Sequence, residues 1–307
     1  MGTTKDPLRI AVSAGDPFGV GPELCRAALA AYRGSNCRLT VFGDPSQFED
    51  LEPDELVAVP IEGNAPDRPS PSAVGGAASI RALQRALEGI RAGDYDALVT
   101  APISKESWGL AGGAIDGHTP YLGAFFEAEP LMTFVWDEDE PLVALLTTHI
   151  PLRAVPATLT SARVERAVRI VVDALRERLG RQEPAIGVLG LNPHAGEAGL
   201  LGTEEIDFVA PAIERLCEAG LRVDGPLPGD TAFAIRHRYD ALLALYHDQG
   251  LAPVKALAFD RAVNLTLGLP VVRTSPCHGT AFDLVGTGSA NPQSMLAAVK
   301  WAARLTR

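Results

Sequence analysis

The sequence predicts an α/β protein, with mostly parallel sheets covered by helices on both faces, and two observations favour this class. Short apolar runs, typical of strands buried in parallel sheets, recur along the chain. Segments with helical periodicity alternate with them, which indicates layered strand–helix units. With 307 residues, 47% of them hydrophobic, the chain is long enough for a large core in one domain or in two lobes.

Composition and periodicity assign the elements in order. The predicted strands cover residues 8–14, 38–43, 95–101, 131–136, 141–148, 185–193, 240–246 and 262–266. The predicted helices cover residues 22–32, 73–92, 162–179, 203–219 and 292–305. Pro22 suits the first position of its helix, where its missing N–H would have no partner. In helix 73–92, Ile80, Leu83 and Leu87 recur on one face, and Gly180 suits the C-terminal cap of helix 162–179.

Two connecting segments stand out by composition. The stretch 49–72 is rich in Pro, Asp and Glu, and we expect it to meander on the surface. The polar stretch 112–118 is the best candidate for a crossing between two lobes, since no other linker is apparent.

The charge balance and the cysteines limit the class of protein. A formal net charge of -11 argues against nucleic acid as the main partner, and an anionic substrate would need a local cluster of Lys, Arg or His. The four cysteines are scattered without a CxxC pair, which fits a reducing cytoplasm better than a disulfide framework. No apolar run reaches the roughly 20 residues of a membrane span, and the short polar start lacks the pattern of a signal peptide.

Three predicted strands lead directly into a histidine. The runs 141–148, 185–193 and 240–246 are followed by His149, His194 and His247, three of only six histidines in the chain. Ligands bind at the carboxyl ends of the strands in such sheets, so the three imidazoles should share one edge. Each alone is more often a core or capping histidine, but together they predict a metal site with open positions for a substrate.

Other motifs leave alternatives open. The glycine-rich turn 15–23 follows the first strand and is either a tight structural turn or an anion-binding loop, and it lacks the GxGxxG spacing. Gly117-His118-Thr119 is either a surface loop or a binding site for phosphate or carboxylate. Asp230 is either a catalytic carboxylate or the N-cap of the next helix, and Asp248 could orient a metal-ligating histidine.

The last third of the chain supplies polar residues that a site would need. Lys255 and Arg273 would provide positive charge that the overall composition lacks, although surface charge is the simpler explanation for each. Asn264 lies in a strand-like run, where an exposed polar residue needs no functional explanation.

Taken together, these motifs resemble the 4-hydroxythreonine-4-phosphate dehydrogenase family of pyridoxal phosphate biosynthesis. The resemblance spans nearly the whole chain and rests on ordered blocks at 15–23, 100–105, 117–119, 148–152, 191–197, 230–233, 246–251 and 264–283. It implies a two-lobed fold similar to isocitrate and isopropylmalate dehydrogenases. On that basis we expect a first lobe of residues 1–115 and 270–307, and a second lobe of residues 116–269 that carries the metal-binding histidines and the dimer contacts.

The resemblance also implies a site. One divalent metal (Zn, Mg, Co or Mn) would be held by His149, His194 and His247. Substrate contacts would come from five residues: His118, Thr119, Lys255, Asn264 and Arg273. The block that follows would bind NAD or NADP through His278, Gly279, Thr280, Asp283 and Asn291. Members are homodimers whose active sites are built from both subunits, so one of the three histidines can come from the partner.

The implied reaction is oxidation of a secondary alcohol, with loss of carbon dioxide from the resulting 3-oxo acid. The metal would polarise the hydroxyl, and Lys255, Asp248 or Asp230 would take its proton. The chain departs from the family pattern at Pro120, where an acidic residue is common, at Cys277, in place of an aspartate before the histidine, and at Gly229, in place of a frequent alanine.

Three other functions remain open. Family relatives oxidise D-threonate or D-erythronate 4-phosphate, and more distant ones oxidise aromatic cis-dihydrodiols. Three histidines with carboxylates would also permit a metal-dependent hydrolase or lyase without nicotinamide. A catalytically silent binding protein on the same scaffold is the third.

Overall fold

The computed structural model describes residues 7–33, 35–52, 54–113 and 117–306. The chain divides into two compact units: unit 1 comprises Met1–Ala128 and Leu269–Arg307, and unit 2 comprises Glu129–Gly268. This division differs from the expected boundary after residue 115, because it assigns the helix that begins at His118 to unit 1. The stretch 112–118, predicted to cross between lobes, lies partly outside the described residues; its last residue starts that helix.

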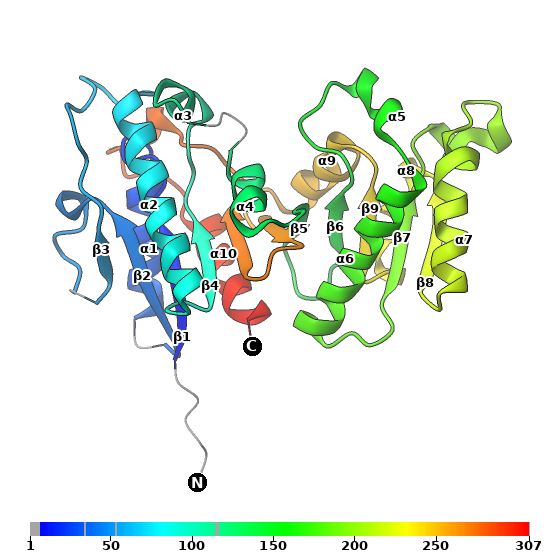
Figure 1. Cartoon of the computed structure of the whole chain (residues 1–307), viewed down its shortest axis with the longest axis horizontal. Coiled ribbons are helices and arrows are strands. Elements are labelled where there is room, and N and C mark those ends of the chain that lie inside the picture. The colour runs from blue at the N-terminus through cyan, green and yellow to red at the C-terminus, as the bar shows by residue number, and fades with distance from the viewer. Residues whose placement is uncertain (1–6, 34, 53, 114–116, 307) are drawn as a thin grey trace, which may run out of the picture. The chain divides into compact units, whose positions relative to one another are not determined.

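Unit 1 is built on a parallel sheet (Figure 1). Its strands, in spatial order, are β3 (Leu56–Ala58), β2 (Cys37–Gly43), β1 (Leu8–Ser13), β4 (Ala97–Thr100) and β11 (Val272–Pro276). Strand β3 lies inside the stretch 49–72 that we expected to meander on the surface. Strand β11 was not predicted, because Arg273 and the hydroxyl side chains around it interrupt the apolar pattern of a buried strand.

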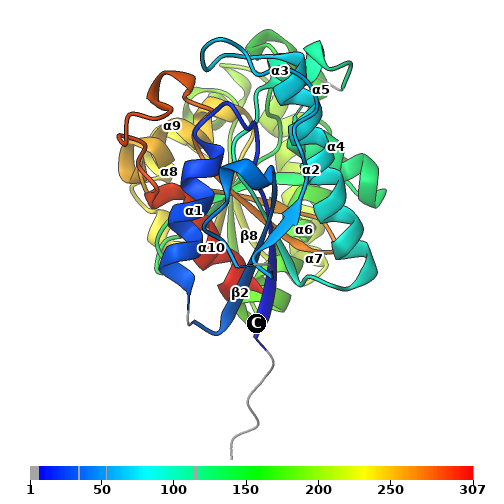
Figure 2. The ribbon, with the colours of Figure 1, turned by 90° about the vertical axis from the view of Figure 1, so that its left-hand side faces the viewer.

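Helices cover both faces of this sheet. Figure 2 shows α1 (Gly21–Tyr32) and α10 (Gln293–Leu305) on one side of the strands and α2 (Ala73–Ala92) on the other. Helices α3 (Lys105–Leu110) and α4 (His118–Phe126) pack on the α2 side. The core there centres on Trp108, which is fully buried and donates its indole N–H to Ser79 Oγ at 2.9 Å. Satisfying that donor allows a large polar aromatic to fill the interior.

Unit 2 has a mixed sheet. Its strands, in spatial order, are β10 (Val263–Leu267), β5 (Leu131–Val135), β6 (Leu142–Leu145), β9 (Ala241–Ala244), β7 (Ala185–Leu189) and β8 (Arg222–Leu227). The pairs β10–β5 and β5–β6 are antiparallel, and the pairs from β6 to β8 are parallel. The predicted fold class, mostly parallel sheets with helices on both faces, is confirmed.

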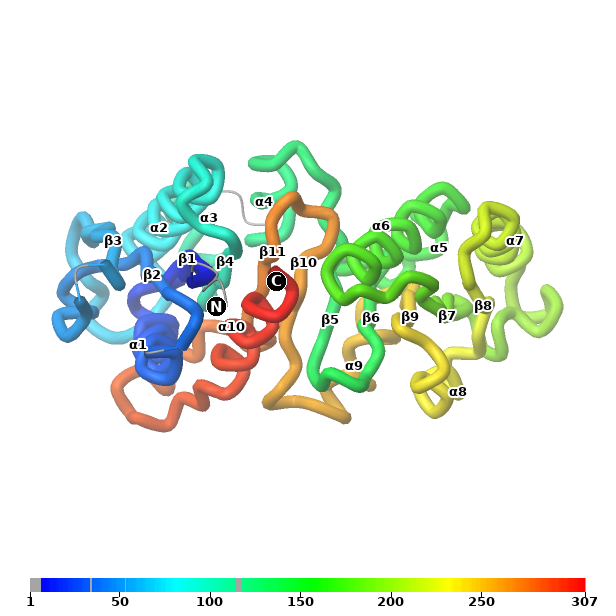
Figure 3. The backbone as a smooth tube through the Cα atoms, turned by 90° about the horizontal axis from the view of Figure 1, so that it is seen from below, coloured from blue at the N-terminus to red at the C-terminus, as the bar shows by residue number. Residues whose placement is uncertain are grey.

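The helices of unit 2 lie on both faces of its sheet. Figure 3 shows α6 (Ser161–Leu179) and α7 (Ala210–Glu218) on one face, and α8 (Gly229–Ala232) and α9 (His247–Ala258) on the other. Helix α6 ends as predicted, with Gly180 in the left-handed conformation at φ 67°. Short α5 (Val155–Thr158) precedes it. No described helix is long and apolar enough to cross a membrane.

The predicted helix 203–219 is two different elements. A π-helical turn, Glu205–Val209, comes first, and α7 follows directly. The apolar pattern alone could not separate the two elements, because each places an apolar residue in the core. Val209 of the π-helical turn and Ala212 of α7 are both fully buried. Single π-turns inside α-helices occur frequently at functional sites, and this one begins with a buried glutamate.

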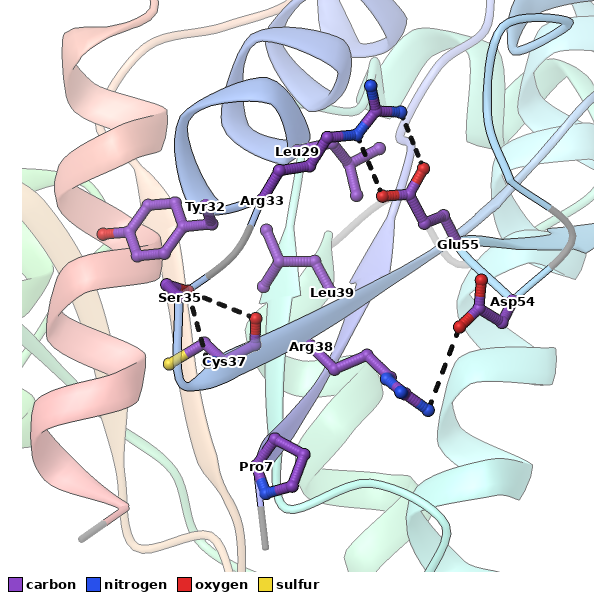
Figure 4. A pocket seen from close by; sticks show the side chains of 10 residues that line it. All are labelled: Pro7, Leu29, Tyr32, Arg33, Ser35, Cys37, Arg38, Leu39, Asp54 and Glu55. Carbon is purple, nitrogen blue, oxygen red and sulfur yellow. Dashed lines mark hydrogen bonds and ion pairs between the residues drawn. The ribbon is translucent and has the colours of Figure 1, made fainter.

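A pocket in unit 1 lies away from the carboxyl ends of the strands. It is lined by Pro7, Leu29, Tyr32, Arg33, Ser35, Cys37, Arg38, Leu39, Asp54 and Glu55 (Figure 4). Pro7 precedes β1 and Cys37 begins β2, so the pocket lies at the amino ends of these two strands. Arg33 pairs with Glu55 at 2.8 Å and Arg38 lies 3.9 Å from Asp54, so the cations already face carboxylates. This pocket contains none of the predicted site residues.

Candidate active site

Three loops of unit 2 converge on one edge of the sheet. Strands β6, β9 and β7 are neighbours and parallel, so the segments after them leave at the same carboxyl edge. His149, His247 and His194 lie on these segments. The strands themselves end earlier than predicted, at Leu145, Ala244 and Leu189, because polar and turn residues leave the ladder before each histidine.

Two of the histidines lie together. The ring centroids of His149 and His247 are 5.5 Å apart, with a 43° angle between the rings. His247 is the first residue of α9, and its Nδ1 lies 2.7 Å from Oδ1 of Asp248. A carboxylate at Nδ1 fixes the tautomer with the proton on that nitrogen and leaves the Nε2 lone pair for a ligand. The predicted orienting contact of Asp248 is therefore present.

Gln249 joins two of the loops that carry histidines. Its Oε1 accepts a hydrogen bond from Leu245 N at 2.7 Å, and its Nε2 donates to Gly190 O at 2.6 Å. The first bond holds the start of α9 against the end of β9. The second holds the start of the His194 segment. One amide side chain thus fixes the spacing of the two segments.

His194 lies in a left-handed turn. Every residue from His194 to Gly199 has a positive φ, between 45° and 95°. Four of them (His194, Ala195, Glu197 and Ala198) carry side chains, and the left-handed region costs an L-residue roughly 1–2 kcal/mol. Nδ1 of His194 lies 2.8 Å from Oε2 of Glu197. As with His247, this contact leaves Nε2 available.

The donor chemistry fits a divalent metal, but one chain does not assemble the predicted ligand set. Among the described residues, no group of three or more His, Cys, Asp or Glu side chains is arranged to hold a metal. His149 and His247 form a pair, and His194 is not grouped with them. That His149, His194 and His247 bind one metal, with one of them supplied by a partner subunit, therefore stays a prediction.

Unit 1 brings together two of the predicted substrate residues. Arg273 on β11 is only 2% exposed, and its Nη2 donates to Thr100 Oγ1 at 2.6 Å. His118 begins α4, packs its ring edge-on against Trp108 at 5.7 Å, and has a buried Nε2 without a hydrogen bond to any described residue. Thr119 follows it, partly exposed. Pro120 occupies the first turn of α4, where a proline costs no helical hydrogen bond.

The charge of His118, but not that of Arg273, differs from what was expected. Burial, and then the nearby Arg273 guanidinium, hold the pKa of His118 well below its ordinary value of 6.5. Burial lowers the pKa of Arg273 to about 10, so that side chain stays protonated at neutral pH. His118 is neutral without a bound anion. It can offer an N–H to a phosphate, but it does not add positive charge to the cluster of Lys, Arg or His that an anionic substrate was expected to need.

The lowered pKa of His118 predicts pH-dependent stability. Between the folded-state pKa and 6.5, the unfolded chain binds a proton that the folded chain does not. The stability that neutral His118 contributes is therefore complete above about pH 6.5 and is lost as the pH falls further. In urea titrations, we expect the free energy of unfolding of the wild type to fall by up to about 1.4 kcal/mol per pH unit more than that of His118→Gln. Equal slopes would contradict the burial of this imidazole.

The remaining predicted residues of unit 2 lie on separate elements. Lys255 is in the last turn of α9, and Asn264 is on β10, with a buried Oδ1 that bonds to no described residue. A buried amide oxygen without a hydrogen bond is unusual. The explanation that Asn264 is an ordinary exposed strand residue therefore does not hold. Asp230 is exposed in the first turn of α8, whose N-cap is Pro228. The capping alternative for Asp230 is therefore wrong.

The predicted cofactor block packs on the glycine-rich turn. Val20 N donates to Thr280 O at 2.9 Å, and Gly286 N donates to Glu23 Oε1 at 2.8 Å. A Cβ on Gly19 would lie 2.9 Å from the Thr280 Cβ, so only glycine fits that approach. The turn is thus a tight structural one. The other residues of the block, Gly279, His278, Asp283 and Asn291, are exposed.

Open backbone in this block fits a dinucleotide. A Cβ built at Gly279, Gly286 or Gly288 would meet no heavy atom within 4 Å. Exposed glycine backbone lets a ligand approach closely. His278 Nδ1 contacts Gly279 O at 3.0 Å, and Asn291 Oδ1 accepts from Gln293 N at 3.0 Å. Cys277, one of the departures from the family pattern, donates its backbone N–H to Ser294 Oγ.

Sequence reasoning missed three residues near these sites. Glu197 contacts His194, and Glu205 binds the backbone just before it. Lys105 lies against Gly117, with its Cε 3.1 Å from where a Cβ would be. Glu197 and Lys105 fall inside the blocks that carry the family resemblance, which was the available signal. Glu205 had none, because its partners are main-chain N–H groups.

Comparison with known proteins decides the family. A family model described as "Pyridoxal phosphate biosynthetic protein PdxA" matches residues 20–302. The chain belongs to this family. A curated PdxA relative from Methylorubrum populi, named 4-hydroxythreonine-4-phosphate dehydrogenase, is 41% identical, with 99% of this chain and 96% of the relative covered.

Solved structures agree with the PdxA assignment. The 4-hydroxythreonine-4-phosphate dehydrogenase of Klebsiella pneumoniae matches with a TM-score of 0.85 and 35% identity, over 98% of this chain and 100% of that one. A terephthalate 1,2-cis-dihydrodiol dehydrogenase from Burkholderia xenovorans LB400 has a TM-score of 0.68 and 29% identity, over 97% and 98%. Isocitrate dehydrogenase from Methylococcus capsulatus, at 16% identity and a TM-score of 0.51 over 96% and 85%, shares the fold. Both the predicted family and the predicted fold relationship are confirmed, and the chain is a member of a family of dehydrogenases.

Proposed function

We propose that this chain oxidises 4-hydroxy-L-threonine 4-phosphate with NAD or NADP and a divalent metal. The product would be a 3-oxo acid that decarboxylates to 3-amino-2-oxopropyl phosphate, in pyridoxal 5′-phosphate biosynthesis. The observation that carries the proposal is end-to-end similarity to enzymes of that name. The scattered cysteines favour the cytoplasm as the compartment.

His149, His194 and His247 would hold the metal. When bound, the cation would polarise the substrate's alcohol as a Lewis acid, and the nicotinamide would accept its hydride. Asp248 and Glu197 would keep the Nδ1 protons of His247 and His194 in place, so that each Nε2 faces outward. A nitrogen-rich ligand set suits zinc or cobalt better than magnesium.

A homodimer with shared metal sites would explain why one chain lacks the full set. His149 and His247 would come from one copy and His194 from the other. Exposed apolar side chains occur along the segments that carry these histidines: Ile150, Leu152, Leu200, Leu201 and Ile206, between 39% and 83% exposed. Such side chains favour burial against another protein surface.

The substrate's charges would be met by the residues carried over from the family. Arg273 would supply a permanent positive charge, since its pKa remains near 10 despite burial. Neutral His118 would donate a hydrogen bond, with Thr119 beside it. Lys255 would add charge, and Asn264 would direct its unsatisfied Oδ1 to a substrate donor.

The general base would be Lys255 or Asp230. Asp248 is less suited, because its Oδ1 already contacts His247 Nδ1 and its role there is to orient the ring. A base needs a free lone pair within hydrogen-bond reach of the alcohol. Asp230 is exposed in the first turn of α8 and offers carboxyl lone pairs, and Lys255 in the last turn of α9 offers an amine nitrogen.

An NAD(P) reduction assay tests the proposal. The panel contains 4-hydroxy-L-threonine 4-phosphate, D-threonate 4-phosphate, D-erythronate 4-phosphate and an aromatic cis-dihydrodiol, each with Zn, Mg, Mn or Co and with chelator. We expect the largest kcat/KM for the first substrate, and loss of activity with chelator. If the enzyme prefers another acid phosphate, the proposed oxidation would stand and the proposed substrate would be wrong. Turnover without nicotinamide would favour the hydrolase or lyase alternative.

A further inference from the structure

We propose that Glu205 is a positioning residue for His194. It would act through the backbone that precedes the histidine and would not touch metal or substrate. The inference rests on the proposed metal role of His194, and it adds a residue to which no function is assigned.

The contacts of Glu205 are unusual for a carboxylate. Glu205 is 2% exposed, yet no Lys or Arg of the described residues forms an ion pair with it. Instead, Oε1 accepts hydrogen bonds from Leu191 N and Asn192 N, both at 2.7 Å. Oε2 accepts from Asn192 Nδ2 at 2.9 Å. Three N–H donors thus solvate a buried negative charge, and bonds to charged acceptors are the stronger kind.

These bonds act where β7 stops. The last ladder bond of this strand is donated by Gly190 N to Leu227 O at 2.8 Å, so the N–H groups of Leu191 and Asn192 need other acceptors. Glu205 supplies both from the opening residue of the π-helical turn. Glu205, together with Gln249 at Gly190 O, therefore sets the direction in which the chain leaves the sheet towards His194.

The left-handed turn is built around the same carboxylate. A Cβ on Gly196 would lie 2.7 Å from Glu205 Oε2, and one on Gly190 would lie 3.2 Å from Oε1. The backbone on both sides of His194 therefore contacts the carboxylate closely. Leu201 N closes the turn by donating to Gly196 O at 3.1 Å. A run of positive-φ residues persists only where surrounding contacts determine it, and Glu205 is the buried group at its centre.

The neighbouring Glu204 provides a matched control. Its Oε2 accepts from the same Asn192 Nδ2, at 2.7 Å, but the main-chain N–H groups of Leu191 and Asn192 donate to Glu205 instead. Val209 provides a second control. It is fully buried in the same π-helical turn, so Val209→Ala lowers stability without removing an acceptor.

The experiment measures the affinity of the full-length protein for Zn²⁺ alone, by competition with a chelator. We expect Glu205→Ala to weaken binding about 10- to 100-fold, the usual loss when the partner that orients a metal ligand is removed. Glu205→Gln keeps an acceptor at Oε1 and should recover most of the affinity. Glu204→Gln and Val209→Ala should bind Zn²⁺ with an affinity within about twofold of the wild type. This loss is far smaller than the 10- to 100-fold loss expected for Glu205→Ala.

Hydrogen exchange and thermal melting complete the test. Hydrogen exchange at the backbone amides of Leu191 and Asn192 should be faster in Glu205→Ala than in the wild type. In Glu205→Gln the exchange rate should increase less. If Glu205→Ala does not fold, Glu205→Met, which keeps the side-chain length and removes both oxygen acceptors, decides: faster exchange at these amides with weaker Zn²⁺ binding supports the proposal, and wild-type values for both overturn it. Equal losses of affinity in Glu205→Ala and Val209→Ala would also overturn it, because they would show a general effect of stability. Unchanged Zn²⁺ binding in His194→Ala would instead remove the metal role on which the inference rests.

Discussion

Replacing His194 with alanine is expected to reduce metal-dependent NADH formation on the order of 10³-fold. The loss follows from the Lewis-acid contribution of a catalytic metal, several kcal/mol, at about 1.4 kcal/mol per factor of ten. Zn²⁺ affinity should fall in parallel. Initial rates of NADH absorbance with the phosphorylated substrate, at saturating metal, measure the effect.

His237→Ala is the matched control. His237 is an exposed histidine of unit 2 in the short 3-10 turn Arg236–Arg238, away from the strand ends that carry the other three. We expect wild-type activity from it. Full activity of His194→Ala after chelation and metal return would exclude His194 as a ligand.

Mixing variants tests whether the site is shared. When His194→Ala and His247→Ala chains are unfolded together and refolded, random pairing into two-fold dimers gives half mixed dimers. If ligands come from both copies, each mixed dimer has one intact site and one without either histidine. Activity should then return to about one quarter of the wild-type value. No recovery, with mixed dimers demonstrated, would place all three histidines of each site in one chain.

The position of the three histidines was predictable because it depends on topology. Parallel strands share a carboxyl edge, and short apolar runs followed by His149, His194 and His247 were enough to place them there. Their detailed geometry was not predictable. It depends on a left-handed turn that includes Ala195 and Ala198, residues whose own preferences oppose that conformation.

Glu205 and Arg273 show why charged residues at buried positions escape such reasoning. Glu205 is bound by main-chain N–H groups of residues 13 and 14 positions earlier, and the sequence of those residues does not determine the contact. Arg273 lies on a central strand where an apolar residue is expected, and its hydroxyl partner, Thr100, is 173 residues away. In both cases the burial depends on a hydrogen-bond partner fixed by the fold. Buried charge of this kind is therefore a feature that the structure adds to the sequence.

Arg273→Ala is expected to raise the KM for a phosphorylated substrate on the order of 10²- to 10³-fold. A guanidinium donates two parallel bonds to a phosphate, and each hydrogen bond to a charged group contributes about 1.5–2 kcal/mol at the lower end of its usual range, which gives this loss at about 1.4 kcal/mol per factor of ten. Burial strengthens this effect, because Arg273 is 2% exposed and water cannot replace it. A non-phosphorylated analogue should lose far less, and steady-state kinetics on both substrates separates the two effects.

Two variants isolate the charge from the packing. Thr100→Val removes the hydroxyl that accepts from Arg273 Nη2 at 2.6 Å while keeping the shape, and should raise the KM by roughly tenfold through loss of orientation. Arg261→Ala removes an exposed arginine paired with Asp137 at 3.1 Å, and should leave the KM unchanged. Equal losses on phosphorylated and non-phosphorylated substrates in Arg273→Ala would show that the residue serves the fold of unit 1. A selective loss would identify Arg273 as the phosphate anchor, because only the charge of the ligand differs between the two assays.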